Sequence, residues 1–148
     1  MVRRLTAATA VAMFAVVAAT AVVAQSDVVK QRQAVLKEFG TLTRPVGGML
    51  RGSAAFDLAA VQAALDAYIK GAKALPGLFP EGSGPGAGTD ALAAVWKDKA
   101  DFDARFARFE ADATAARAAI TDEASFKANM PGVLRSCGGC HDVYRQKS

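Results

Sequence analysis

The chain has 148 residues with 18 basic and 14 acidic side chains, which gives a formal net charge of +4. This length fits one domain with a single buried core. Because no basic stripe interleaved with aromatic residues appears, the composition gives no support to nucleic-acid binding.

The N-terminus has the pattern of an export signal. Arg3 and Arg4 are followed by an uncharged, Ala- and Val-rich run that reaches Ala24. The small residues just before Gln25 suit signal-peptide cleavage. We therefore expect a cleaved signal peptide over residues 1–24 and export. An uncleaved membrane anchor is the alternative, since the uncharged run is about long enough to span a bilayer.

The mature domain is predicted to be residues 25–148. Removal of the signal peptide takes away two arginines and no acidic residue, so 16 basic and 14 acidic side chains remain and the formal charge falls to +2. The mature form is not expected to be membrane-bound.

Hydrophobic periodicity in the mature domain predicts four amphipathic helices. Apolar residues recur at alternating steps of three and four, whereas strand-like alternation is missing. The four stripes run from Val28 to Met49, Leu58 to Leu75, Leu92 to Ile120 and Phe126 to Tyr144. The Gly/Pro-rich segment 76–88 is the predicted long loop.

Breakers and caps predict where these helices begin and end. Gly47-Gly48 and Gly52-Ser53 are expected to separate the first two helices, and Pro45 and Pro131 are expected to kink or restart theirs. The expected N-caps are Ser53 for the second helix, Thr89 or Asp90 for the third, and the 121–123 segment for the fourth. Four such helices with mostly short connections predict an all-α, antiparallel up-and-down four-helix bundle.

The segment Cys137-Gly138-Gly139-Cys140-His141 holds both cysteines and the sole histidine of the chain. Two thiols at this spacing can add to the vinyl groups of a haem, and the histidine that follows can ligate the iron. We therefore predict one covalently attached haem c per chain, held by Cys137 and Cys140 with His141 as the metal ligand.

Three other interpretations of this motif are weaker. A thioredoxin-like thiol pair would need a βαβ context. A structural zinc needs four ligands, and the chain offers two thiolates and one imidazole. A plain disulfide would leave the adjoining histidine unexplained.

A sixth iron ligand is hard to find in the sequence. Met49 and Met130 are the mature thioethers, and neither is well placed to reach the face opposite His141. An open axial position is therefore expected, and such an iron can bind a small diatomic ligand as well as carry electrons.

The C-terminal motif, extended through Asp142 to Arg145, resembles that of cytochrome c′, the class II c-type cytochromes. An early helix with Arg32 and Gln33 adds to the likeness, which covers the mature chain from about Asp27 to Lys147. The resemblance implies that Arg32 and Gln33 lie by the haem propionates. It also implies that Leu36 faces the iron on the distal side and that Arg145 lies beside His141.

The sequence thus favours a periplasmic haem protein with five-coordinate, high-spin iron that binds NO or CO and carries single electrons. It is not expected to be an enzyme, since no nucleophile or carboxylate pair is indicated. The alternative is a low-spin electron carrier with Met49 as sixth ligand. The redox partner is not identified, and the first two helices are compatible with a homodimer.

Overall fold

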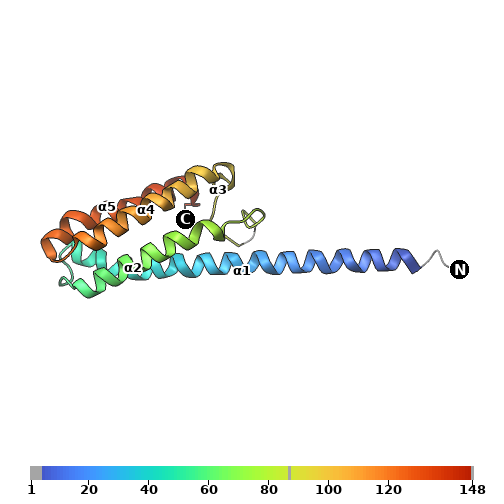
Figure 1. Ribbon diagram of the computed structural model, residues 1–148, viewed down its shortest axis with the longest axis horizontal. Coiled ribbons are helices and arrows are strands. Elements are labelled where there is room, and N and C mark those ends of the chain that lie inside the picture. The colour runs from blue at the N-terminus through green and yellow to red at the C-terminus, as the bar shows by residue number, and fades with distance from the viewer. Residues whose placement is uncertain (1–4, 87, 148) are drawn as a thin grey trace.

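The computed structural model describes residues 27–86 and 88–147 in full, and before Asp27 it gives only the run of the first helix. The predicted signal peptide, residues 1–24, lies outside the fully described residues. The elements are α1 (Leu5–Leu50), α2 (Leu58–Ala74), the 3₁₀ helix η1 (Leu75–Leu78), α3 (Ala94–Lys97), α4 (Lys99–Ala119) and α5 (Glu123–Tyr144) (Figure 1).

The four long helices form the predicted bundle, with α1 beside α2, α2 beside α4 and α4 beside α5 (Figure 1). The all-α prediction is confirmed. Within the described residues the one β-type pairing is an isolated bridge between Ala91 and Arg145, which ties the end of α5 to the segment before α3. No helix in the fully described part is long and apolar enough to cross a bilayer.

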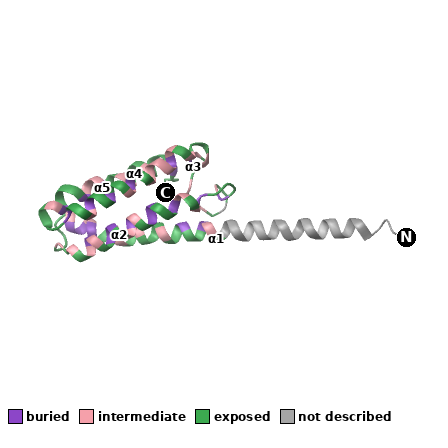
Figure 2. Cartoon of the chain, in the orientation of Figure 1, coloured by how far each residue is buried: buried purple, intermediate pink, exposed green. Residues whose placement is uncertain are grey.

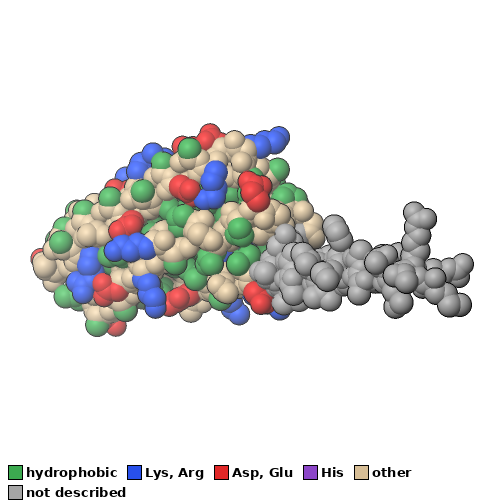
Figure 3. Space-filling model, turned by 45° about the vertical axis from the view of Figure 1, so that its right-hand side comes forward, with side chains coloured by type: hydrophobic (Ala, Val, Ile, Leu, Met, Phe, Trp, Pro, Cys, Tyr) green, Lys and Arg blue, Asp and Glu red, His purple; other side chains and the backbone are tan. Residues whose placement is uncertain are grey.

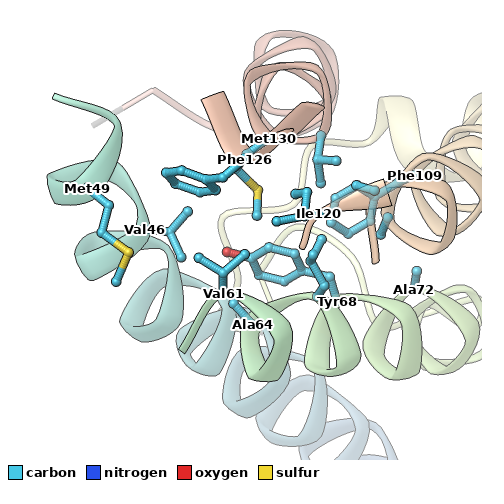
Figure 4. Packing of buried hydrophobic residues seen from close by; sticks show 14 residues of the cluster. Val46, Met49, Val61, Ala64, Tyr68, Ala72, Phe109, Ile120, Phe126 and Met130 are labelled. Carbon is cyan, nitrogen blue, oxygen red and sulfur yellow. The ribbon is translucent and has the colours of Figure 1, made fainter. Parts of the chain in front are cut away.

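Apolar stripes meet along the bundle axis, so buried side chains lie on the inner faces of the helices (Figure 2). The larger core cluster includes Val61, Tyr68 and Phe126 (Figure 4). Leu65 belongs to the same cluster. A second cluster lies around Leu75, Phe79, Val95, Phe102 and Tyr144, at the end of the bundle near the long loop.

Of the two expected glycine breaks, Gly52-Ser53 ends the first helix and Gly47-Gly48 does not. The helix runs to Leu50, and Gly52, with φ of 73°, supplies the left-handed residue that stops it. The amide of Ser53 donates to the Gly48 carbonyl and that of Gly52 to the Met49 carbonyl, which is a Schellman motif. Ser53 is therefore part of the α1 terminus and not the N-cap of α2.

Aspartates cap the other long helices. The side chain of Asp57 accepts from the Ala60 amide at the start of α2. Asp98 caps α4 after a break that splits the third predicted helix, so Thr89 and Asp90 are not its caps. Asp122 forms a capping box with Ser125 at the start of α5, which confirms the predicted fourth boundary.

Neither proline ends its helix. Pro45 lies inside α1 and Pro131 inside α5, and both helices continue through them. Each proline removes one backbone hydrogen bond, but apolar side chains next to it are buried: Val46 after Pro45, and Met130 before Pro131. Tertiary packing holds the helices where the local sequence would break them.

Candidate functional site

A cavity of about 940 Å³ lies between α1 on one side and α4 and α5 on the other. Cys137, Cys140 and His141 all line it. This volume is at the upper end of the range for cofactor sites. The two cysteines and the histidine therefore share one space that is large enough for a prosthetic group.

The cavity wall is mainly apolar and aromatic. The apolar lining consists of Leu36, Phe39, Phe79, Val95, Phe102, Phe106, Phe109 and Leu134. The rings pack on one another, as in the edge-to-face contact between Phe102 and Tyr144, whose centroids are 5.1 Å apart. Such a wall suits the faces of a flat macrocycle.

Local electrostatics fit a thioether linkage better than thiol chemistry. Burial raises the pKa of both Cys137 and Cys140. Catalytic thiols need a lowered pKa, because the thiolate is the nucleophile. Desolvation, together with the charge of Arg145, lowers the pKa of His141, which favours the neutral imidazole that ligates a metal.

The donor set also argues against a structural zinc. No group of three or more His, Cys, Asp or Glu side chains that could hold a metal ion occurs in the fully described residues. A covalent haem needs two thiols, one imidazole and an apolar slot, and all of these are present in the cavity. The residues present therefore fit the prosthetic group that the motif predicts.

Arg32 binds the long loop in addition to its predicted role at the propionates. Arg32 as a whole residue is 1% exposed, and its guanidinium donates to the Leu78 carbonyl at 3.1 Å and to the Ser83 hydroxyl and carbonyl at 2.9 and 2.6 Å. It also lies 4.5 Å from the centre of the Phe79 ring. Arg32 thus holds the long loop against α1 while also lining the cavity, and its contact with a propionate stays a prediction.

Gln33 and Leu36 also line the cavity. Gln33 Nε2 donates to the Gly88 carbonyl at 2.9 Å, so Gln33 too is tied to the loop. Leu36 is 37% exposed and presents an aliphatic group to the cavity from α1. The structure therefore brings both residues to the site, and their contacts with the haem stay predictions.

Arg145 follows the last residue of α5 and lines the cavity beside His141. Its Nη2 lies 3.5 Å from Asp90 Oδ2, and its amide donates to the His141 carbonyl. The side chain is paired and close enough to influence the imidazole. Its predicted role on the proximal face remains open.

A polar network next to the motif was missed in the sequence. Tyr144 Oη and Arg105 Nε each donate to Asp101 Oδ2 at 2.6 Å, and Arg105 Nη1 donates to the Gly139 carbonyl at 3.0 Å. This network joins α4 to the turn between the two cysteines. The i,i+4 pair of Asp101 and Arg105 was visible as a pattern, but its partners on α5 were not.

Both candidate methionines lie elsewhere. Met49 and Met130 belong to the larger core cluster (Figure 4). Neither of them is among the residues that line the cavity. Within the described residues, then, no thioether faces the site of the motif.

The fold and the cavity together define a class of protein: a c-type haem protein built on a four-helix bundle. A family model described as Cytochrome C′ matches residues 27–145. The chain belongs to the cytochrome c′ family, and its cofactor is covalently attached haem c.

Named relatives agree with this assignment. Cytochrome c′ from Rhodopseudomonas palustris is 50% identical over 119 residues, which are 80% of this chain and 82% of that protein. A solved structure of cytochrome c′ from the same species has 51% identity and a TM-score of 0.79, and the match covers 82% of this chain and 98% of the solved one. Cytochrome c-556 from Agrobacterium fabrum is 36% identical over 120 residues, 80% of this chain and 81% of that protein.

A more distant solved relative carries a gas ligand. It is a nitric oxide complex of a leucine-to-alanine variant of cytochrome c prime from Alcaligenes xylosoxidans. The identity is 26%, the TM-score is 0.72, and the match covers 84% of this chain and 97% of the solved one.

Proposed function

We propose that this protein is a periplasmic haem carrier whose iron is five-coordinate and high-spin in the resting state, binds NO or CO, and carries single electrons. The observation that carries the proposal is the α1 wall of the cavity, which presents Leu36 and no methionine or histidine. Haem held by one histidine, with no protein ligand on its other face, supplies an iron that binds a diatomic gas and changes oxidation state by one electron.

The aliphatic side chain expected beside the iron favours NO and CO over dioxygen. Bound dioxygen gains from a hydrogen-bond donor next to it, and Leu36 offers none. Thr43 Oγ1 donates to the Phe39 carbonyl at 2.7 Å, and Gln33 Nε2 donates to Gly88. Leu36 instead offers an apolar surface to a bound ligand.

Charged residues of the chain fit the remaining parts of the group. Arg32 and Gln33 are the residues that we expect to hold the propionates, since a buried guanidinium with no carboxylate among its described hydrogen-bond partners favours an anionic neighbour. Arg145 lines the same cavity as His141, and we expect it on the proximal side of the haem. Cys137 and Cys140 fix the porphyrin to α5.

Export supports the periplasmic assignment. The family model matches residues 27–145 and so begins after the predicted signal peptide, residues 1–24. A segment of this kind would be removed on export. Mass spectrometry of the protein purified from its host should find Gln25 as the first residue.

Optical spectra test the gas-binding proposal. The reduced protein should show a high-spin spectrum that changes on addition of CO, and Met49→Leu should leave both spectra unchanged. Leu36→Ala should speed CO binding because it removes the side chain in front of the iron. A resting low-spin spectrum that Met49→Leu converts to high-spin would instead establish the alternative, a His/Met electron carrier like the one that the sequence left open.

A further inference from the structure

Basic residues recur every seventh position along α1 and at the first position after its end: Lys30, Lys37, Arg44 and Arg51, all of them exposed. On a helix, residues seven apart share a face, with a drift of about 20° per heptad. The last three also line the cavity, and the Arg51 guanidinium lies over Gly47, another lining residue. We call Lys37, Arg44 and Arg51 the α1 basic stripe.

The stripe differs from three other arginines around the cavity. Arg105 and Arg108 pair with Asp101, and Arg145 pairs with Asp90. None of the three stripe residues has an ion-pair partner among the described residues. Elsewhere basic and acidic side chains lie interspersed, as on the face in Figure 3. The stripe therefore leaves uncompensated positive charge along one edge of the cavity.

The haem itself cannot account for the whole stripe. Lys37 and Arg51 are two heptads apart, which is about 21 Å along a helix axis. The two propionates leave one edge of the porphyrin, so they cannot neutralise both ends of such a row. The acidic residue of α1 that is nearest to the stripe is Glu38, which directly follows Lys37. It does not line the cavity.

We propose that the α1 basic stripe is the docking surface for an acidic electron-transfer protein, which it brings to the edge of the haem cavity. The inference rests on the proposed electron-carrying function. Weak electron-transfer complexes bury less than about 1,200 Å² in total, and a row about 21 Å long matches one side of such an interface. Unpaired charges at the rim raise the association rate with a partner of opposite sign.

Each encounter moves one electron. A reduced partner loses one electron, the ferric haem gains it, and no proton or group is transferred. The stripe lies on the cavity rim, so a partner seated on it is brought near the haem that the cavity holds. A basic surface far from this edge would attract the partner but would leave a long distance between its redox centre and the haem.

The probe is a plant-type [2Fe–2S] ferredoxin, a small acidic protein that donates one electron. Stopped-flow absorbance gives the rate at which reduced ferredoxin reduces the holoprotein. The test variant is Lys37→Glu/Arg44→Glu/Arg51→Glu. The matched control is Lys70→Glu/Lys97→Glu/Arg135→Glu, which reverses three exposed charges that neither line the cavity nor pair with a described residue.

At low ionic strength we expect the stripe variant to slow reduction at least about tenfold and the control to slow it much less. The rate for the unaltered protein should fall with added salt, and this dependence should vanish in the stripe variant. NMR shifts caused by oxidised ferredoxin should map to residues 37–51. If the charge reversals prevent folding, the corresponding Gln variants replace them, with the same expectation at smaller size.

Other outcomes separate the possible failures. Equal slowing by both triple variants overturns the docking surface but leaves the proposed function intact, provided that dithionite still reduces the haem. A second outcome is that the protein sediments with phosphatidylglycerol vesicles only when the stripe is intact, while the stripe variant is reduced by ferredoxin at the unaltered rate. This pair of results overturns the protein docking surface and shows that the stripe binds a membrane surface. A holoprotein that dithionite does not reduce overturns the proposed function itself.

Discussion

Tyr144 shows how one residue near the motif is set by its neighbours. It lies three positions after His141, and its hydroxyl donates to Asp101. Burial, and then the hydrogen bond and charge of Asp101, raise the pKa of Tyr144 to about 12. The same hydrogen bond, followed by that of Arg105, lowers the pKa of Asp101. The pair therefore favours a neutral phenol beside a charged carboxylate.

This arrangement makes a prediction about alkaline pH. The ordinary pKa of Tyr144 is 10.0, so between pH 10.0 and about 12 the unfolded chain loses the phenol proton while the folded chain keeps it. The free energy of unfolding should therefore fall as pH rises through this window, because the unfolded state binds fewer protons. Tyr144→Phe should remove that decline, at a cost of about 1 kcal/mol at neutral pH for the lost hydrogen bond.

Denaturant titrations of both proteins at several pH values measure this effect. Tyr68 is common to both chains, so its own titration cancels in the comparison. A difference between the two proteins that stays constant from neutral pH to pH 12 would contradict the prediction.

At the scale of elements, the close approach of α1 and α2 depends on Gly71. A Cβ added at Gly71 would press on the Phe39 ring and lie 2.9 Å from Val35 Cγ1, and Phe39 lines the haem cavity. The contact between these helices is therefore coupled to the shape of the cavity wall.

Gly71→Ala should destabilise the protein by about 1–3 kcal/mol, the usual cost of overpacking a core. It should also shift the haem absorption bands, because Phe39 has to move. Gly132→Ala on α5 is the matched control: its nearest neighbour, Arg135 Nη2, is 3.8 Å away. That variant should gain roughly 0.5–1 kcal/mol from helix propensity, and thermal unfolding compares the two. A stable Gly71→Ala protein with unchanged bands would show that the two helices can separate freely.

At the scale of the whole molecule, the bundle is closed by contacts between α1 and α2, α2 and α4, and α4 and α5, while the cavity separates α1 from α4 and α5. The covalent haem is thus expected to form part of the core. Since apolar burial is the dominant favourable term in folding, the cofactor should contribute much of the stability of this end of the bundle.

Removal of the attachment tests this role. Cys137→Ala/Cys140→Ala should yield a protein with little bound pigment, a lower thermal midpoint and increased binding of a hydrophobic dye, with helical content largely kept. The larger core cluster, which contains Val61, Leu65 and Phe126, should keep that end of the bundle folded. Unfolding of the variant at the midpoint of the holoprotein would show that the haem adds nothing to stability.

The local sequence by itself determined the helices, the attachment motif and the family, because these depend on periodicity and on spacing within a few residues. It failed where distant segments act. Pro45 and Pro131 stay inside helices because neighbouring side chains are buried against other elements, and α1 continues through Gly47-Gly48 to the other predicted break at Gly52.

Only the tertiary structure decided which side chains meet. Arg32 reaches Ser83, and Arg105 reaches Gly139, across loops whose course no local pattern specifies. Met49 lies in the core rather than at the cavity. The basic residues at every seventh position indicate a binding surface only because three of them lie on the cavity rim. Contacts between residues far apart in the chain depend on how whole helices pack, and that information is not local.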